Sequence, residues 1–273
     1  MDQHRVRSTR PDSTDTGERL AEAVRLAPSW AGDVAVVSPH LDDAVFSVGA
    51  SMRAAVRRGA SVSVVTVCTG DPDSRTPAGA SNRAMGFATT GAAAQARREE
   101  DARACDALGV RPVWLGFPDD PNEPAPPGGE VARVLGEELS RYDAVLMPGF
   151  PLTHPDHLEA SRIVLEVAGA GQSLGLYVEQ PYASWNALAR RRRPRRSREA
   201  GLTALGLRVS PAPRWTRAAA RPDDWLAKLR AMSEYPSQLR VLRRLPRLRI
   251  MVYEVVRGGE GVMWCRLAGA TAG

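Results

Sequence analysis

Short apolar runs alternate with longer amphipathic segments over the first two-thirds of the chain. The runs are rich in β-branched residues and predict strands at residues 33–38, 61–68, 112–117, 144–147 and 174–179. The segments between them predict helices at residues 44–58, 91–108, 130–140 and 156–168. Such β-α alternation predicts an α/β fold in which helices cover both faces of a mostly parallel sheet.

The two ends of the chain follow this alternation less clearly. A helix is expected at about residues 16–26, before the first strand. After residue 181 we expect an extended piece at 207–215, a helix at 223–232, and strands at 250–256 and 262–267. We interpret these pieces as additions to one domain over residues 1–273, with a β/α core at 33–180 and a smaller, β-containing C-terminal extension at 181–273.

Composition narrows the classes of protein that fit. With 273 residues, 43% of them hydrophobic, the chain is long enough to bury a sizeable core. No stretch is long and apolar enough to be a transmembrane segment, and the polar start lacks the apolar run of a secretory signal, so a cytoplasmic protein is expected. The three cysteines are far apart and form no CxxC pair, which argues against a disulfide framework and a thiolate zinc site.

Much of the net charge of +6 comes from residues 190–198, RRRRPRRSR, whereas Lys228 is the only lysine. A run of like charges is usually a solvated loop, and this is the interpretation we favour. The run could also attract an anionic substrate, nucleic acid or a lipid surface. No aromatic residues interleave it and no nucleic-acid-binding motif accompanies it, so no nucleic acid partner is expected.

Three of the four histidines come directly after predicted strands. His40 follows the first strand, and His154 and His157 follow the fourth. In the common strand order 3-2-1-4-5 the first and fourth strands are neighbours, and ligands bind at the carboxyl ends of the strands beside that point. The topology therefore predicts that the three histidines meet.

Each of these histidine segments also carries aspartates. His40 and Asp43 are three residues apart, so both can face one ion, with Asp42 free between them. Alternatively, Asp42 or Asp43 caps the helix that follows, and an aspartate of the His154–His157 segment (HPDH) caps the next one. Two such clusters at neighbouring strand ends favour a shared metal site over two independent caps.

Two histidines and one carboxylate with an open position form a known catalytic zinc arrangement. The same nitrogen and oxygen ligands also suit iron(II), manganese or cobalt. The chain has no HExxH motif, and the H-x-E beginning at His157 lacks the PCxxC of a nucleobase deaminase. There is also no GxGxxG after the first strand, so dinucleotide binding is not supported.

The SPHLDD and HPDH segments, at 38–43 and 154–157, resemble the LmbE-like/PIG-L family of zinc deacetylases. The motif Arg97-x-x-Glu100, followed by ALGV at 107–110, is similar to the same family, and the resemblance extends over roughly residues 33–180. It implies a Rossmann-like three-layer sandwich and zinc-dependent hydrolysis of N-acetylglucosaminyl amides.

The resemblance also implies roles for individual residues. The zinc ligands would be His40, Asp43 and His157. Asp42 would be the general base, and His154, oriented by Asp156, would act on the departing amine or the oxyanion. Arg97 and Asp119 would contact sugar hydroxyls. Asp120 is equally near in sequence for that role, and Arg97 could instead form an ion pair on a helix surface.

The length, the early PHLDD and the long loop at residues 70–91 are most similar to the teicoplanin-type deacetylases of lipoglycopeptide antibiotic biosynthesis. This resemblance implies a glycopeptide substrate carrying N-acetylglucosamine, with that loop, Tyr182 and Trp185 as candidates for a wide mouth. The alternative enzyme is a deacetylase of a small glucosaminyl conjugate, such as the mycothiol precursor. Other possibilities are a different amidase, a thiol-S-conjugate hydrolase, or a non-catalytic sugar-binding module.

Overall fold

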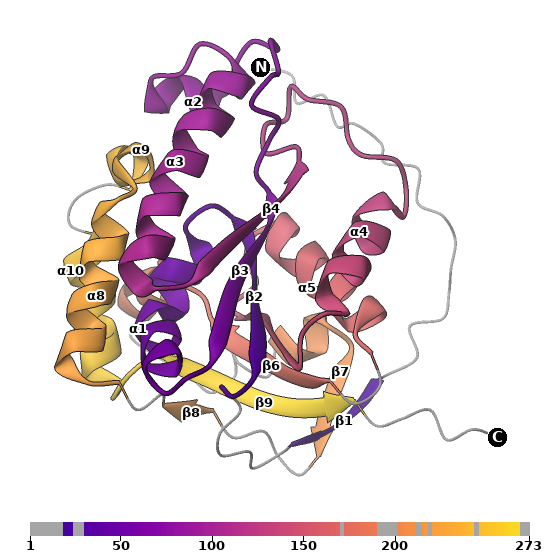
Figure 1. The fold of residues 1–273 in the computed structure, drawn as a ribbon, viewed down its shortest axis with the longest axis vertical. Coiled ribbons are helices and arrows are strands. Elements are labelled where there is room, and N and C mark those ends of the chain that lie inside the picture. Colours follow the sequence, from indigo (N-terminus) through magenta and orange to yellow (C-terminus); the bar gives the residue numbers. More distant parts are fainter. Residues whose placement is uncertain are drawn as a thin grey trace.

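The computed structural model describes residues 19–23, 30–169, 172–189, 201–210, 215–217, 220–242 and 246–267 (Figure 1). Within these ranges nine strands form one sheet in the order β4-β3-β2-β5-β6-β9-β1-β7, with β8 paired to β9. The strands are β1 Arg19–Ala23, β2 Asp33–His40, β3 Ser61–Cys68, β4 Arg111–Phe117, β5 Ala144–Phe150, β6 Ser173–Val178, β7 Leu207–Ser210, β8 Thr216–Arg217 and β9 Gly261–Leu267.

The five strands from β4 to β6 are parallel and have the predicted order 3-2-1-4-5. Strand β2 lies at their centre, where Val34 pairs with Val62 of β3 on one side and with Ala144 of β5 on the other. A strand buried on both faces requires a continuous apolar run, which explains the sequence VAVV at 34–37. The predicted α/β fold with a mostly parallel sheet is confirmed.

Helices cover both faces of this sheet (Figure 1). Their bounds are α1 Asp43–Arg57, α2 Ala80–Met85, α3 Thr90–Leu108, α4 Glu130–Leu139, α5 Pro155–Val167, α6 Tyr182–Ala189, α8 Pro222–Ser233, α9 Pro236–Val241 and α10 Pro246–Val256. Alternate residues of β2 face opposite ways. Val34 and Val36 join a core with α1, α3 and α8, whereas Ala35 and Val37 join a core with α4 and α5. The sheet is thus the middle layer of three.

Helix α1 is interrupted at Val48, whose φ of −135° and ψ of 22° are not helical. Backbone N–H groups after such a break have no carbonyl in the preceding turn to bond with. Glu260 satisfies them, because its carboxylate accepts from Ala50 N at 3.0 Å and from Ser51 N at 2.7 Å. A residue close to β9 therefore caps the second half of the helix that follows His40.

A buried ion-pair network balances the charge of Glu260. The ammonium of Lys228, from α8, lies 2.6 Å from Glu260 and 2.7 Å from Glu254 of α10, and all three side chains are at most 2% exposed. The Lys228 side chain packs directly on Gly49 of α1: a Cβ atom added to Gly49 would lie 3.0 Å from Lys228 Cγ. The only lysine thus connects α1, α8 and α10.

Two predicted elements are wrong. Residues 250–256, expected to be a strand, belong to helix α10. The helix expected at 16–26 is contradicted by β1, which pairs parallel to β7 and antiparallel to β9. In both cases the deciding partners are distant in sequence. Residues 190–198, with the arginine run, lie outside the described ranges.

The long loop after β3 contains a short helix that the sequence did not predict. Helix α2 lies inside residues 70–91, and a bridge between Pro77 and Thr89 closes the segment around it.

In the described parts of the chain, no helix is both long and apolar enough to cross a bilayer.

Candidate active site

The carboxyl edge of the sheet brings the three strand-following histidines together. His40 is the last residue of β2, and His154 and His157 lie where the chain leaves β5 and begins α5. Because β2 and β5 are neighbours, the three rings meet, with centroids 5.3 Å apart for His40–His154 and His40–His157 and 5.2 Å for His154–His157.

His40, Asp43 and His157 point their polar atoms at one another. Asp43 Oδ2 lies 3.2 Å from both His40 Nδ1 and His157 Nε2, and the two nitrogens are 3.3 Å apart. Such a group of one carboxylate oxygen and two imidazole nitrogens, all within 4.8 Å of one another, suits a transition-metal ion. The residues therefore fit the metal implied by the sequence, and they leave room for further ligands from the cleft.

The electrostatics of this group favour positive charge between its members. Burial lowers the pKa of His157, but the Asp43 carboxylate and the hydrogen bonds to Asp43 and Glu179 outweigh it and raise the pKa to about 10. For His40, burial is likewise outweighed by Asp156 and Asp43, and its pKa also rises to about 10. Burial raises the pKa of Asp43, yet the adjoining histidines hold it well below its usual range.

Asp42 has a strained backbone, and its side chain does not cap α1. Its φ is 154° and its ψ is −26°, a conformation unusual for a residue other than glycine, and its side chain makes no cap hydrogen bond. The nearby capping contact comes instead from Ser38, whose Oγ accepts from Ala44 N at 3.0 Å and donates to His40 O at 2.7 Å. Asp42 is thereby free to line the cleft, where burial and then the Asp43 charge raise its pKa well above the usual value.

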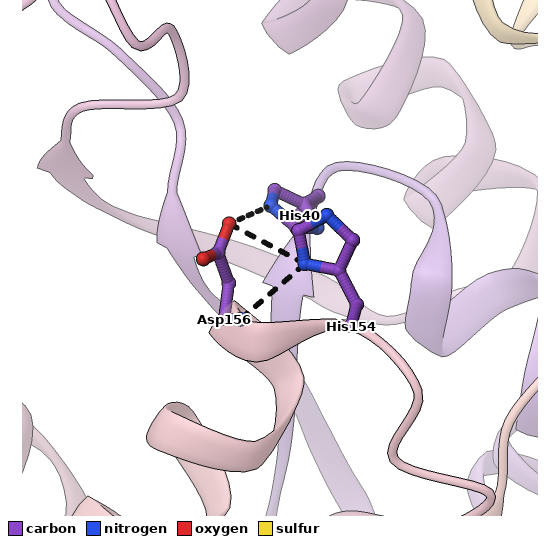
Figure 2. A group of neighbouring side chains, drawn as sticks. All are labelled: His40, His154 and Asp156. Atoms are coloured by element: carbon purple, nitrogen blue, oxygen red, sulfur yellow. Dashed lines mark hydrogen bonds and ion pairs between the residues drawn. The ribbon is translucent and has the colours of Figure 1, made fainter. Parts of the chain in front are cut away.

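His154 is the N-cap of α5, and its Nδ1 accepts a hydrogen bond from Asp156 N at 3.3 Å. The Asp156 carboxylate contacts both rings from one side: its Oδ2 is 3.1 Å from His40 Nε2 and 3.5 Å from His154 Nδ1 (Figure 2). Burial and the charge of His40 lower the pKa of His154 by more than Asp156 raises it, so the net pKa is lowered.

Arg97, which is buried, and Asp119, which is partly buried, form an ion pair beside the histidines. Asp119 Oδ1 also lies 3.7 Å from His40 Nε2, so this aspartate belongs to the site. Asp120 also lines the cleft, but its carboxylate accepts from Gly79 N at 2.7 Å and Asn82 Nδ2 at 2.8 Å. Arg97 is 5% exposed, which rules out the alternative of an ion pair on the helix surface.

A cleft of about 740 Å³ opens over these residues. Tyr182 and Trp185 line it, with ring centroids 5.8 Å apart, and Tyr182 packs edge-on against His157 at 5.4 Å. The segment 70–91 also contributes, since Asn82 and Met85 of α2 line the cleft. The loop and both aromatic residues that were expected at the mouth thus line the cleft.

Comparison with known proteins identifies the core of the chain. Residues 35–168 match the family model described as GlcNAc-PI de-N-acetylase, PIG-L. These residues form a PIG-L family domain. The match includes both histidine segments, Arg97 and Asp119.

Relatives and solved structures agree with the PIG-L assignment. The 2'-N-acetylparomamine deacetylase of Streptomyces fradiae is 33% identical over 171 residues, which is 56% of this chain and 58% of that protein. A deacetylase–bog complex from the teicoplanin biosynthesis pathway superposes with a TM-score of 0.69 at 22% identity, covering 88% of this chain and 100% of the other. A zinc-inhibited form of teicoplanin deacetylase Orf2 gives 0.66 at 21% identity, with the same coverage. At such identities the structural likeness shows the fold.

Other residues at the site come from beyond the PIG-L domain, and two of them were missed in the sequence. Glu179 follows β6 and hydrogen-bonds to His157 Nδ1. Gln238 of α9 lines the cleft, and its amide oxygen, turned towards Arg97, accepts from Nε at 2.9 Å and Nη2 at 2.8 Å. Glu179 had a recognisable signal, because it ends a predicted strand at the edge where the histidines gather. Gln238 had none, since only the fold brings α9 to this edge.

Proposed function

We propose that the protein is a zinc-dependent deacetylase that removes the N-acetyl group from an N-acetylhexosamine unit. The observation that carries this proposal is the placement of His40, Asp43 and His157 around one point, with Asp42 beside them in an open cleft. A sugar-binding module without catalytic function would need neither a metal-ligand set nor a cleft-lining carboxylate next to it. The PIG-L domain and the deacetylases among the relatives support the same reaction.

The proposed reaction adds water to the acetyl carbonyl, breaks the C–N bond and releases acetate and a free amine. Zinc held by His40, Asp43 and His157 would supply Lewis acidity to the carbonyl and acidify water. Asp42, which lines the cleft beside these ligands, accepts the proton that the attacking water loses. Because His154 Nδ1 accepts from Asp156 N, the neutral ring carries its proton on Nε2 and can donate a hydrogen bond from it to the oxyanion or the departing amine. The proton that Asp42 took from water passes to that amine as the C–N bond breaks.

Arg97 and Asp119 are proposed to hold the sugar. Their mutual pairing places a guanidinium and a carboxylate together within the cleft lining, and sugar hydroxyls both donate and accept hydrogen bonds. Gln238 and Trp185, from the C-terminal extension, line the same cleft as His40. This shared lining supports the proposal that residues 1–273 form a single domain, with a core at 33–180 and an extension at 181–273.

For the substrate, we propose an N-acetylglucosaminyl glycopeptide of an antibiotic pathway. The cleft volume of about 740 Å³ and the aromatic side chains of Tyr182 and Trp185 in its lining support a large, partly apolar substrate. The similarity to the 2'-N-acetylparomamine deacetylase favours a second candidate, a small N-acetylated aminosugar conjugate.

Acetate release decides between these candidates. The zinc-loaded protein is incubated with an N-acetylglucosaminyl glycopeptide, N-acetylparomamine and the N-acetylglucosaminyl-inositol conjugate, each with and without chelator. Chelator-sensitive release from the glycopeptide alone supports the full proposal. Release from a small conjugate alone retains the reaction and replaces the substrate. No release from any of them by a protein that binds zinc refutes the deacetylase assignment.

A further inference from the structure

A buried carboxylate lies directly behind one of the proposed metal ligands. Glu179 is 2% exposed and His157 is 1% exposed. Glu179 Oε1 bonds to His157 Nδ1, while Oε2 accepts from Leu152 N at 2.5 Å. The backbone of Glu179 is fixed as well, because its N–H donates to Phe150 O at 2.6 Å. Both oxygens and the main chain of this residue are therefore held in place.

An ionised carboxylate only accepts hydrogen bonds, so the ring nitrogen facing Glu179 must carry a proton. In the neutral imidazole the other nitrogen then has a free lone pair. That nitrogen, His157 Nε2, lies 3.2 Å from Asp43 Oδ2 and 3.3 Å from His40 Nδ1, on the side where the metal ligands converge. The contact with Glu179 thus determines which nitrogen of His157 can bind a metal.

The second oxygen of Glu179 acts on the turn that leads to His154. Leu152 has a left-handed φ of 51°, uncommon for leucine, and lies between the end of β5 and His154. The bond from Leu152 N to Glu179 holds this turn against β6. One side chain therefore restrains the entry to α5 as well as the ring of His157.

We infer that Glu179 is a positioning residue that holds His157 as the Nδ1–H tautomer and so presents Nε2 to the metal. This inference rests on the metal site of the proposed function. It places a required element of the site outside residues 35–168, directly after strand β6. Carboxylates behind metal-binding histidines typically change metal affinity 10–100-fold when they are replaced.

Glu179→Gln is the decisive variant, because it preserves size and removes one acceptor. If the new amide NH₂ faces His157, Nδ1 must accept and Nε2 carries the proton that blocks coordination. If the amide NH₂ faces Leu152 N instead, the Leu152 N–H and the amide N–H are both donors, and neither has an acceptor. We expect Zn²⁺ affinity, measured by competition with a chromogenic chelator, to fall about 10–100-fold. Glu179→Asp, which keeps the carboxylate, should bind Zn²⁺ more tightly than Glu179→Gln.

Tyr177→Phe is the matched control. Tyr177 is also buried on β6, and its hydroxyl donates to Val37 O at 2.9 Å without touching the ligand set. Removing this hydroxyl should leave Zn²⁺ affinity unchanged. Equal Zn²⁺ affinity in Glu179→Gln and the wild type would overturn the inference, as would equal losses in Glu179→Gln and Tyr177→Phe.

A measurement on the wild-type protein applies even if Glu179→Gln fails to fold. With only four histidines, ¹⁵N-histidine labelling gives a simple spectrum. In the Zn²⁺-loaded protein, His157 should show a protonated Nδ1 and a coordinated Nε2, and the reverse would refute the inference. A wild type that binds no Zn²⁺ overturns both this inference and the proposed function. Glu179-dependent Zn²⁺ binding without acetate release would overturn the reaction alone.

Discussion

Replacing Lys228 with methionine should lower the stability of the protein far more than the loss of one surface charge would. The Lys228 ammonium is fully buried and lies within 2.9 Å of both Glu254 oxygens and 2.6 Å from Glu260. Methionine fills a similar volume but leaves the Glu260 carboxylate without a counter-ion. Removing one partner of a buried ion pair typically costs about 3–5 kcal/mol.

The loss should depend on pH because Glu254 titrates within the accessible range. Burial raises the pKa of Glu254 and the Lys228 charge lowers it, and the net pKa is about 8, above the usual 4.5 of a glutamate. The stability that this group contributes is therefore fully present below pH 4.5 and is lost as pH rises through 8. Without the ammonium, Glu254 stays protonated in the folded variant above pH 8. The deficit of Lys228→Met should then grow by up to about 1.4 kcal/mol per pH unit.

Thermal unfolding followed by circular dichroism tests this reasoning at pH 6 and pH 9. For a chain of this size, about 3–5 kcal/mol corresponds to a decrease in Tm of roughly 6–20 °C. Arg103→Met is the matched control, since its partner Glu234 and Arg103 itself are 39% and 53% exposed, and exposed pairs contribute about 0–1 kcal/mol. A Lys228→Met protein that unfolds at the same temperature as Arg103→Met would show that the network contributes no stability.

Three further predictions concern the site and the loop above it. Asp42→Asn should retain Zn²⁺ by metal analysis yet release acetate about 10²–10⁴-fold more slowly, and near-normal turnover would exclude Asp42 as the base. Gly91→Ala should destabilise the segment 70–91 and make it more sensitive to limited proteolysis, because the new Cβ would lie 2.2 Å from Ser74 O; unchanged cleavage would contradict this packing. Burial raises the pKa of Asp120, but its hydrogen bonds lower the pKa by more, so the pKa in the folded protein is below that in the unfolded chain. The ionised carboxylate therefore stabilises the fold above the unfolded-state pKa, and this stability is lost as pH falls through the folded-state pKa. Proteolysis of the same segment should therefore increase below about pH 4 in the wild type, while Asp120→Asn should lack this acid dependence.

The five parallel strands from β4 to β6 could be predicted because each is encoded by a short, continuous segment of the sequence. Each apolar run is long enough for a strand and ends in turn residues, and the known strand order places His40 beside His154 without knowledge of any contact. The proximity of these residues follows from the same rule, since side chains that leave neighbouring parallel strands meet at one edge.

The sequence prediction of secondary structure was wrong where contacts with residues distant in sequence determine the element. Residues 250–256 contain several β-branched residues, yet Ile250 and Glu254, four residues apart, face the protein interior as one side of α10. Glu254 is stabilised there by Lys228, which the local sequence does not reveal. Similarly, residues 19–23 become a strand only because β7 and β9 supply hydrogen bonds from the far end of the chain.

The position of β9 in the sheet has a consequence for synthesis on the ribosome. Residues 33–178 contain all five parallel strands in one contiguous stretch, and Glu179 follows directly. Strand β1 is synthesised before the other described strands but pairs antiparallel with β9, so that Ala21 can pair with Leu267 only after residue 267 has been made. Strand β1 therefore lacks its antiparallel partner during most of translation. During that time its unpaired backbone N–H and C=O groups can form hydrogen bonds with a wrong strand. Once residue 179 has been made, by contrast, every segment that carries the proposed metal ligands is present.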